Sequence, residues 1–350
     1  MQLGPKLPSW KSTQAQGIAA ALLSALASGL VPIFGKQAYE AGLAPFTLVM
    51  LRTVGAAGAL WLIYLIFWRK FIYIYPFAFA ACLVAGVVNG LGSLMFYTSL
   101  QRLDASISQL LFTLYLLFLT LFSWLDGYRI SRLTLVRLGL ALLAVVLLKW
   151  SPNGAADWPA ALLMIAAGAL YALHVSINQH TLYDVPAPTV TLYTLSGMAL
   201  TVFIAYAVNG YPPLPATAGA WQPVLLLTAV TLIARLTLFL GVKHLGGMQA
   251  VLINLGEGLV TVLAAIAWLG ETFTPVQWLG AAVLGASLLL VTREQALGVI
   301  PRPKPWLQIF TQWFATLSAT FGAASPPEAD PPRPPKPAPK GASPSNTPDD

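Results

Sequence analysis

Ten apolar stretches, each close to the length of a helix that crosses a membrane, follow one another along the chain. A hydrocarbon core about 30 Å thick needs roughly 20 helical residues, and turn sequences rich in proline and glycine separate the stretches. The stretches span residues 17–39, 46–68, 77–100, 105–125, 133–148, 160–179, 189–208, 221–241, 248–268 and 276–291, of which the fifth and the tenth are short. The sequence therefore predicts an all-α polytopic membrane protein with ten transmembrane helices.

Composition supports this class. Hydrophobic residues make up 57% of the 350 residues and charged residues 9%, whereas soluble domains carry about 25% charged residues. The single cysteine, Cys82, excludes an intramolecular disulfide. The net charge of +7 comes mostly from loops between the apolar stretches and forms no solvated basic face, so we expect no binding of nucleic acid.

The basic residues of the loops predict the orientation, because lysine and arginine are retained on the cytoplasmic side. With the N-terminus inside, one side carries Lys6, Lys11, Arg69, Lys70, Arg129, Arg132, Lys243, Arg293, Arg302 and Lys304, and the other carries Lys36, Arg102 and Lys149. We therefore expect a multi-pass protein of a prokaryotic inner membrane, with both termini in the cytoplasm.

The ends of the chain have a different character. Residues 1–16 form a predicted cytoplasmic segment. Residues 294–325 place aromatic side chains at helical spacing, which favours a helix lying in the membrane interface over an eleventh span. Residues 326–350 are rich in proline and bury too little apolar surface to fold, so they predict a disordered tail.

The two halves of the chain form a weak sequence repeat with a period near 142 residues. Gly55 matches Gly197 at this spacing, and Trp124-Leu125 matches Trp268-Leu269 at 144. We infer two five-helix units, residues 17–150 and 159–293. Because five is odd, the second unit must enter the membrane from the opposite side, and such inverted repeats are typical of transporters that work by alternating access.

Two segments carry a family resemblance. Residues 100–131 contain LDASISQLLFTLYLLFLTLFSWLDGYRIS, and residues 246–291 contain GGMQAVLINLGEGLVTVLAAIAWLGETFTPVQWLGA. They resemble the repeat ends of EamA-like members of the drug/metabolite transporter (DMT) superfamily, in which a helix leads to a Gly-Glu turn. Gly270 and Glu271 match that motif in the second half, and Asp126 stands at the corresponding place in the first. The resemblance implies a ten-helix transporter of small metabolites.

Glu257 lies near the middle of the predicted ninth span. A charged carboxylate there costs at least about 2.5 kcal/mol, so it should face protein or water. We expect a proton carrier or a solute contact, with a structural ion pair as the alternative. Arg235 and Arg52 lie at similar depth and are its possible partners. A cavity holding all three would have a formal charge of +1, which favours a solute with a carboxylate.

Further side chains could line such a cavity. The uncharged polar candidates are Gln109, His174 and Asn254, and the aromatic candidates are Tyr97, Tyr115 and Trp268. Each could instead join helices to one another. We expect a small-molecule solute and membrane lipid as partners, with protons as a candidate coupling ion, no cofactor and no metal; a homodimer is left open.

The leading hypothesis is a secondary transporter that exports a small, amino-acid-like solute, and not an enzyme. Two other classes stay open. Ser93 with His174 could serve an intramembrane hydrolase as nucleophile and base. The proline-rich tail could serve a membrane scaffold that transports nothing.

Overall fold

The computed structural model describes residues 10–125, 157–181, 185–245 and 256–289, with single positions between 136 and 147. These residues form helices and no strand. By its contacts the chain divides into two units, Met1–Lys304 and Pro305–Asp350, and all the described residues belong to the first. The predicted interfacial helix and the predicted disordered tail lie outside the described residues.

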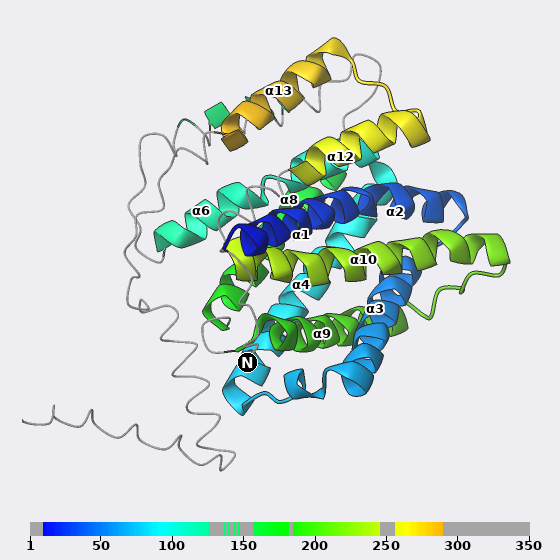
Figure 1. The fold of residues 1–350 in the computed structure, drawn as a ribbon. Helices are drawn as coiled ribbons and strands as arrows, with labels where there is room; N and C mark the ends of the chain where they lie inside the picture. Colours follow the sequence, from blue (N-terminus) through cyan, green and yellow to red (C-terminus); the bar gives the residue numbers. More distant parts are fainter. Residues whose placement is uncertain are drawn as a thin grey trace, which may run out of the picture. The chain divides into compact units, whose positions relative to one another are not determined.

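The helices follow the apolar stretches closely (Figure 1). In chain order they are α1 (Trp10–Gly29), α2 (Val31–Glu40), α3 (Pro45–Phe67), α4 (Pro76–Arg102), α5 (Ala105–Phe112), α6 (Tyr115–Leu125), α8 (Trp158–Thr181), α9 (Ala187–Val208), α10 (Ala218–Leu245), α12 (Gly256–Ala264) and α13 (Pro275–Leu289). A 3-10 turn, Arg69–Phe71, follows α3, and a π-helix, Ala265–Leu269, extends α12. Proline at the first or second position begins α2, α3, α4 and α9, where its missing N–H leaves no helical bond unmade.

Within the described residues, six helices are long and apolar enough to cross a membrane. They are Ala15–Glu40, Pro45–Phe67, Pro76–Arg102, Trp158–Asn178, Ala187–Val208 and Ala218–Leu238. Six of the ten predicted spans are thereby confirmed as helices of the required length. The predicted fifth span, and the first part of the ninth, fall outside the continuous described ranges.

The first span is interrupted at Leu30, between α1 and α2. Pro32 lies just beyond the interruption, and its ring nitrogen cannot donate a hydrogen bond to the carbonyl of Ser28. The hydroxyl of Thr261, from α12, lies 2.7 Å from the carbonyl oxygen of Gly29 and donates to it. A helix from the second half thus supports a carbonyl group at the interruption.

The fourth predicted span, residues 105–125, is also two helices and not one. α5 ends at Phe112, and α6 begins at Tyr115. Helix α8 packs closely against this interruption, since a Cβ atom on Gly168 would lie 3.1 Å from the carbonyl oxygen of Phe112. The sequence has neither proline nor glycine at this place, so no local signal predicts the interruption.

Corresponding pairs of helices pack together when the two halves are exchanged. α1 packs against α10, and its counterpart α8 packs against α4; α3 packs against α10, and its counterpart α9 packs against α4. α1 also packs against α12, as α8 does against α5 and α6. Figure 1 shows α1 and α10 side by side. This correspondence is expected of an internal repeat in which each half completes the other.

Glycines allow the closest of these contacts. A Cβ on Gly86 of α4 would lie 2.5 Å from the carbonyl oxygen of Thr194 and 2.8 Å from Cα of Gly197, both on α9. No real Cβ fits at such distances. The backbones of α4 and α9 therefore touch directly, as small residues permit in membrane proteins.

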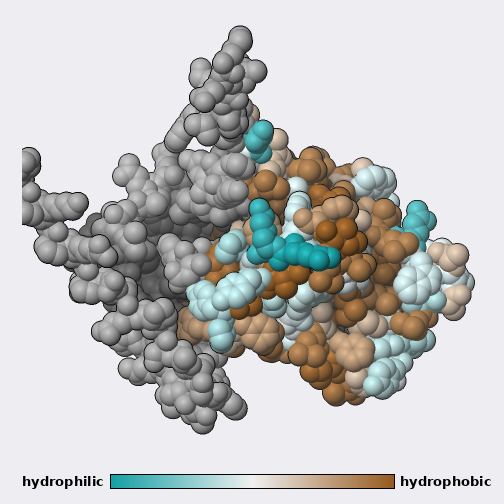
Figure 2. Space-filling view, turned by 60° about the horizontal axis from the view of Figure 1, so that its bottom comes forward, coloured by the Kyte–Doolittle hydropathy of each residue, from teal (hydrophilic) through white to brown (hydrophobic). Residues whose placement is uncertain are grey.

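Large apolar side chains cover much of the outside. Brown, hydrophobic residues dominate the described part of the face in Figure 2. Across the described residues, the exposed large apolar side chains include Leu62, Ile66, Leu162, Leu225 and Leu259. A soluble protein rarely exposes so much contiguous apolar surface. This exterior fits the hydrocarbon of a bilayer.

Candidate functional site

A cavity of about 130 Å3 lies among the helices, with walls from both halves of the chain. Its lining residues are Ser28, Val31, Arg52, Thr53, Asn89, Gly92, Ser93, Phe96, Tyr97, Gln109, Phe112, Ala167, Tyr171, Leu195, Met198, Thr231, Ala234, Arg235, Leu238 and Glu257. The volume is small beside the roughly 300–1,000 Å3 of sites for drug-sized ligands. In this conformation the cavity suits water or a small solute.

Arg52 is the charged residue of α3 in this cavity and is only 8% exposed. Its Nη2 donates to the Ser93 hydroxyl at 2.8 Å and its Nη1 to the Thr231 hydroxyl at 3.3 Å. The guanidinium carbon lies 4.6 Å from the centre of the Tyr97 ring, within the range of a cation–π contact. These contacts are all with neutral groups, so they orient the positive charge without neutralising it.

Three polar atoms of the lining residues are buried without a hydrogen-bond partner in the part of the chain that the structure describes. They are Arg52 Nε, Thr53 Oγ1 and Tyr97 Oη. Leaving a buried polar group unpaired costs about 1–3 kcal/mol. Such groups would be satisfied by a bound molecule that brings hydrogen-bond acceptors.

Glu257 and Arg235 also line this cavity, from α12 and α10. Glu257 is 6% exposed. The structure therefore brings Glu257, Arg52 and Arg235 to one place, together with Gln109 of α5 and Tyr97 of α4. The formal charge of the three ionisable side chains is +1 with the carboxyl ionised, as the sequence predicts.

Three other predicted residues lie away from the cavity lining. His174 is buried, and its Nδ1 lies 3.0 Å from the carbonyl oxygen of Ala85. Tyr115 is buried with its ring centre 5.0 Å from that of Tyr171. Trp268 belongs to the π-helix and is 64% exposed.

Two more predicted residues, Asn254 and Asp126, lie outside the described residues.

Ser93 and His174, the pair considered for a hydrolase, do not contact each other in the structure. Ser93 accepts its hydrogen bond from Arg52, whereas His174 contacts a backbone carbonyl and lies outside the cavity lining.

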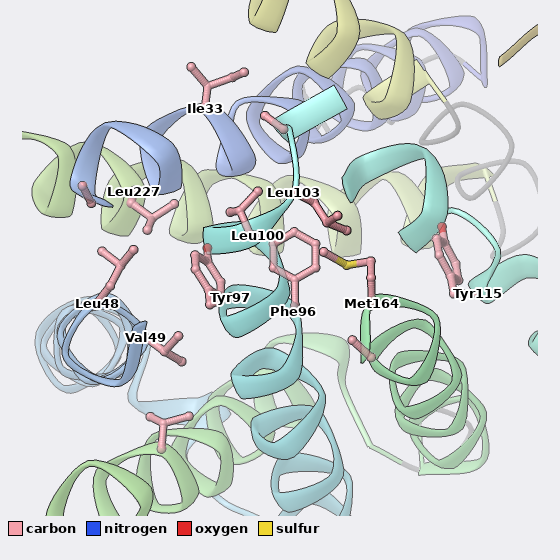
Figure 3. Close-up of a cluster of buried hydrophobic side chains, with 14 of the residues drawn as sticks. Ile33, Leu48, Val49, Phe96, Tyr97, Leu100, Leu103, Tyr115, Met164 and Leu227 are labelled. Carbon is pink, nitrogen blue, oxygen red and sulfur yellow. The ribbon is translucent and has the colours of Figure 1, made fainter. Parts of the chain in front are cut away.

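A layer of buried side chains lies beyond the cavity lining toward one end of the bundle. In Figure 3, Leu48 of α3, Leu100 of α4 and Leu227 of α10 lie near Tyr97, and Ile33 of α2 belongs to the same buried core. Each is at most 1% exposed. Leu48, Leu100 and Leu227 each lie about one helical turn nearer to that end of the bundle than a cavity residue of the same helix. The cavity residues are Arg52 on α3, Tyr97 on α4 and Thr231 on α10. We call these four aliphatic residues the plug.

The repeat-end motif lies at the same end of the bundle as the plug. Gly270 has a φ of +67°, a conformation that suits glycine, and it ends the π-helix. The carboxylate of Glu271 then accepts hydrogen bonds from the backbone N–H groups of Ala105 and Ser106, at the start of α5. The motif from the second half thus holds a helix of the first half.

Thr231 is a lining residue that the sequence prediction missed, although its spacing carries a signal. Asn89, Ser93 and Tyr97 recur every four residues on α4 and so share one face of it. Thr231 precedes Arg235 by the same spacing on α10. A search for polar residues one helical turn from a predicted charge would have found Thr231.

The comparisons with known proteins agree with this architecture. The model of the EamA-like transporter family matches residues 15–150 and 158–293. No curated protein is similar to the chain at a significant level. Twenty-six solved chains match it. One, described as "Crystal structure of protein", has a TM-score of 0.56 at 18% sequence identity, covering 81% of this chain and 98% of its own. At this identity the match shows the fold alone.

Proposed function

Because the chain belongs to the EamA-like transporter family, we propose that it is a secondary transporter that exports a small, amino-acid-like solute by alternating access. The observation that carries this proposal is the cavity between the halves, which holds two arginines and a glutamate inside an apolar bundle. Charged groups at such places are expensive, and they mark the paths of solutes and ions in membrane proteins.

The charges of the cavity support an amino-acid-like solute. Arg52 presents a positive charge whose contacts are neutral, together with an unpaired N–H. A solute carboxylate supplies both the negative charge and the acceptor oxygens that this site lacks. Glu257, which lines the same cavity, offers a negative charge to a solute ammonium group.

The packing supports alternating access. The contacts between the halves recur when the halves are exchanged, so two conformations related by that exchange have similar contacts. In the proposed mechanism, the plug closes the cavity at one end in the present conformation. The exchanged conformation would open that end and close the other.

Protons are the proposed coupling ion, with Glu257 as their carrier. A carboxyl that lines the cavity can be reached from each side in turn, which coupling requires. The basic loops support the orientation with both termini in the cytoplasm. Export, a location in a prokaryotic inner membrane and a homodimer are further parts of the hypothesis.

Uptake into proteoliposomes tests the proposal. A panel of labelled amino acids, carboxylates, amines and neutral sugars is offered to the purified protein, with and without an imposed pH gradient. We expect saturable uptake of a solute with a carboxylate, and its loss in Arg52→Ala. The control is Arg69→Ala, because Arg69 is exposed on the turn after α3. Uptake of amines alone, or no uptake of any solute, contradicts the proposal.

A further inference from the structure

Helix α5 begins without a cap of its own. Its N-cap residue is Asp104, a residue type that commonly accepts a hydrogen bond from the first turn, but Asp104 makes no such side-chain bond. Glu271 takes its place from the second half of the chain. The N–H of Ala105 lies 2.6 Å from Glu271 Oε1, and that of Ser106 lies 3.1 Å from Oε2. Both carboxylate oxygens are therefore used by the start of one helix.

The electrostatics favour this contact. The N-terminus of a helix carries partial positive charge, which a carboxylate stabilises. Hydrogen bonds to an ionised acceptor are also about twice as strong as neutral ones. The backbone of Glu271 is itself held, since its N–H donates to the carbonyl of Ala265 at 3.3 Å. Lys36 of α2 adds a positive charge within electrostatic reach of Glu271, Asp104 and Glu40.

Helix α5 connects this contact to the cavity. Gln109 lies one turn beyond Ala105, is 3% exposed and lines the cavity. On the same helix, Leu111 is fully buried in the core. Because α5 is only eight residues long and is separated from α6 by an interruption, a shift of its first turn must displace Gln109.

We propose that Glu271 is a positioning residue for transport: by holding the first turn of α5, it keeps Gln109 in the cavity and the plug end closed. Opening of that end then requires the bonds from Ala105 and Ser106 to break. The role in transport rests on the proposed function, whereas the hold on α5 is a property of the fold and can be measured without any solute.

Cysteine labelling measures directly whether Glu271 keeps the first turn of α5 in place. The background protein carries Cys82→Ser, which removes the single native cysteine, and Gln109→Cys, which places a thiol in the cavity. Purified protein in detergent reacts with a polar maleimide. We expect Glu271→Ala to raise the labelling rate about tenfold, since it removes two charge-assisted hydrogen bonds. Glu271→Gln keeps the length of the side chain and one acceptor oxygen, so its rate should be intermediate.

Two matched controls separate this role from a general effect of charge. Asp104→Ala removes the N-cap side chain, which makes no capping bond, and Glu40→Gln removes an exposed carboxylate near Lys36. Both should label within about twofold of the background. Gel filtration checks that each variant is folded. Background-level labelling in both Glu271 variants, or equal acceleration in Asp104→Ala, overturns the proposal.

Transport kinetics give the second measurement, in protein with native Gln109. If Gln109 is displaced, the KM for the solute should rise severalfold in Glu271→Ala relative to the wild type. The KM of Glu271→Gln should lie between the two. Mere loss of folded protein would instead lower the maximal rate with KM unchanged, and that result contradicts the positioning role. Failure of the wild type to carry any solute contradicts the proposed function and leaves the labelling result to decide the hold on α5.

Discussion

The guanidinium of Arg52 and the hydroxyl of Ser93 are hydrogen-bonded at 2.8 Å, between α3 and α4. The contact fixes the position of a buried positive charge without cancelling it. A structural arginine in a membrane protein is expected to pair with a carboxylate or to reach the headgroups. Arg52 has neutral contacts in the described part of the chain and is buried, so its charge is directed toward whatever enters the cavity.

The first prediction concerns the shape of this charged group. Arg52→Lys keeps the charge but removes the planar fork that reaches Ser93 and Thr231 together. We expect the apparent affinity for the solute to fall about tenfold to a hundredfold, the equivalent of about 1.4–2.8 kcal/mol. Equilibrium binding of labelled solute measures this. Arg69→Lys is the matched control, and equal affinities in Arg52→Lys and wild type would show that the fork is not used.

The second prediction concerns Glu257 and protons. Glu257→Gln removes the proton-carrying group but keeps the size of the side chain. We expect an imposed pH gradient to accelerate uptake in the wild type and to have no effect in Glu257→Gln, while exchange of solute across the membrane without a gradient continues. The matched control is Glu40→Gln, whose carboxylate is exposed. A pH response that survives in Glu257→Gln assigns the coupling to another group.

The third prediction concerns the contact between α4 and α9. Gly86→Ala puts a methyl group 2.5 Å from a backbone oxygen, so the two helices must separate. Overpacking of this kind costs about 1–3 kcal/mol, and the Tm in detergent should fall. Gly58→Ala is the control, because nothing lies within 4 Å of a Cβ there. Replacing glycine in a helix should then leave the Tm unchanged or raise it. Equal effects of the two substitutions contradict the close contact.

The fourth prediction concerns the interruption of the first span. Thr261 is fully buried, and its hydroxyl donates to the carbonyl of Gly29. Thr261→Val keeps the shape and leaves that carbonyl without this donor, so we expect a loss of about 1 kcal/mol in stability. Thr237→Val is the control, since the Thr237 hydroxyl donates within its own helix. Unfolding followed in detergent compares the two.

Much of the fold is predictable from the sequence, because a bilayer imposes the length and polarity of each span. The interruption at Leu30 has a signal in Pro32, whereas the one after Phe112 depends on packing against Gly168 and has none. Counting helical turns placed Glu257, Arg52 and Arg235 at one depth, and the structure places them in one cavity.

The depth of a residue in the membrane does not determine the direction in which its side chain points, and this limits the prediction of the site residues from the sequence. His174 and Tyr115 lie inside the bundle but face neighbouring helices. Trp268 lies in a π-helix, which winds more widely than an α-helix and so changes the face on which a side chain falls. The contact of Glu271 with α5 joins residues 166 positions apart, and no local pattern indicates it.

Alternating access requires that the cavity open to the two sides of the membrane in turn, and cysteine accessibility in proteoliposomes measures this opening. Ala234 lines the cavity, so Ala234→Cys in the Cys82→Ser background places one thiol there. A maleimide that cannot cross the membrane is applied from outside or enclosed within. We expect labelling from each side, slowed from both sides by the transported solute. Labelling from one side alone, or from neither, would show that the cavity does not alternate between the two sides.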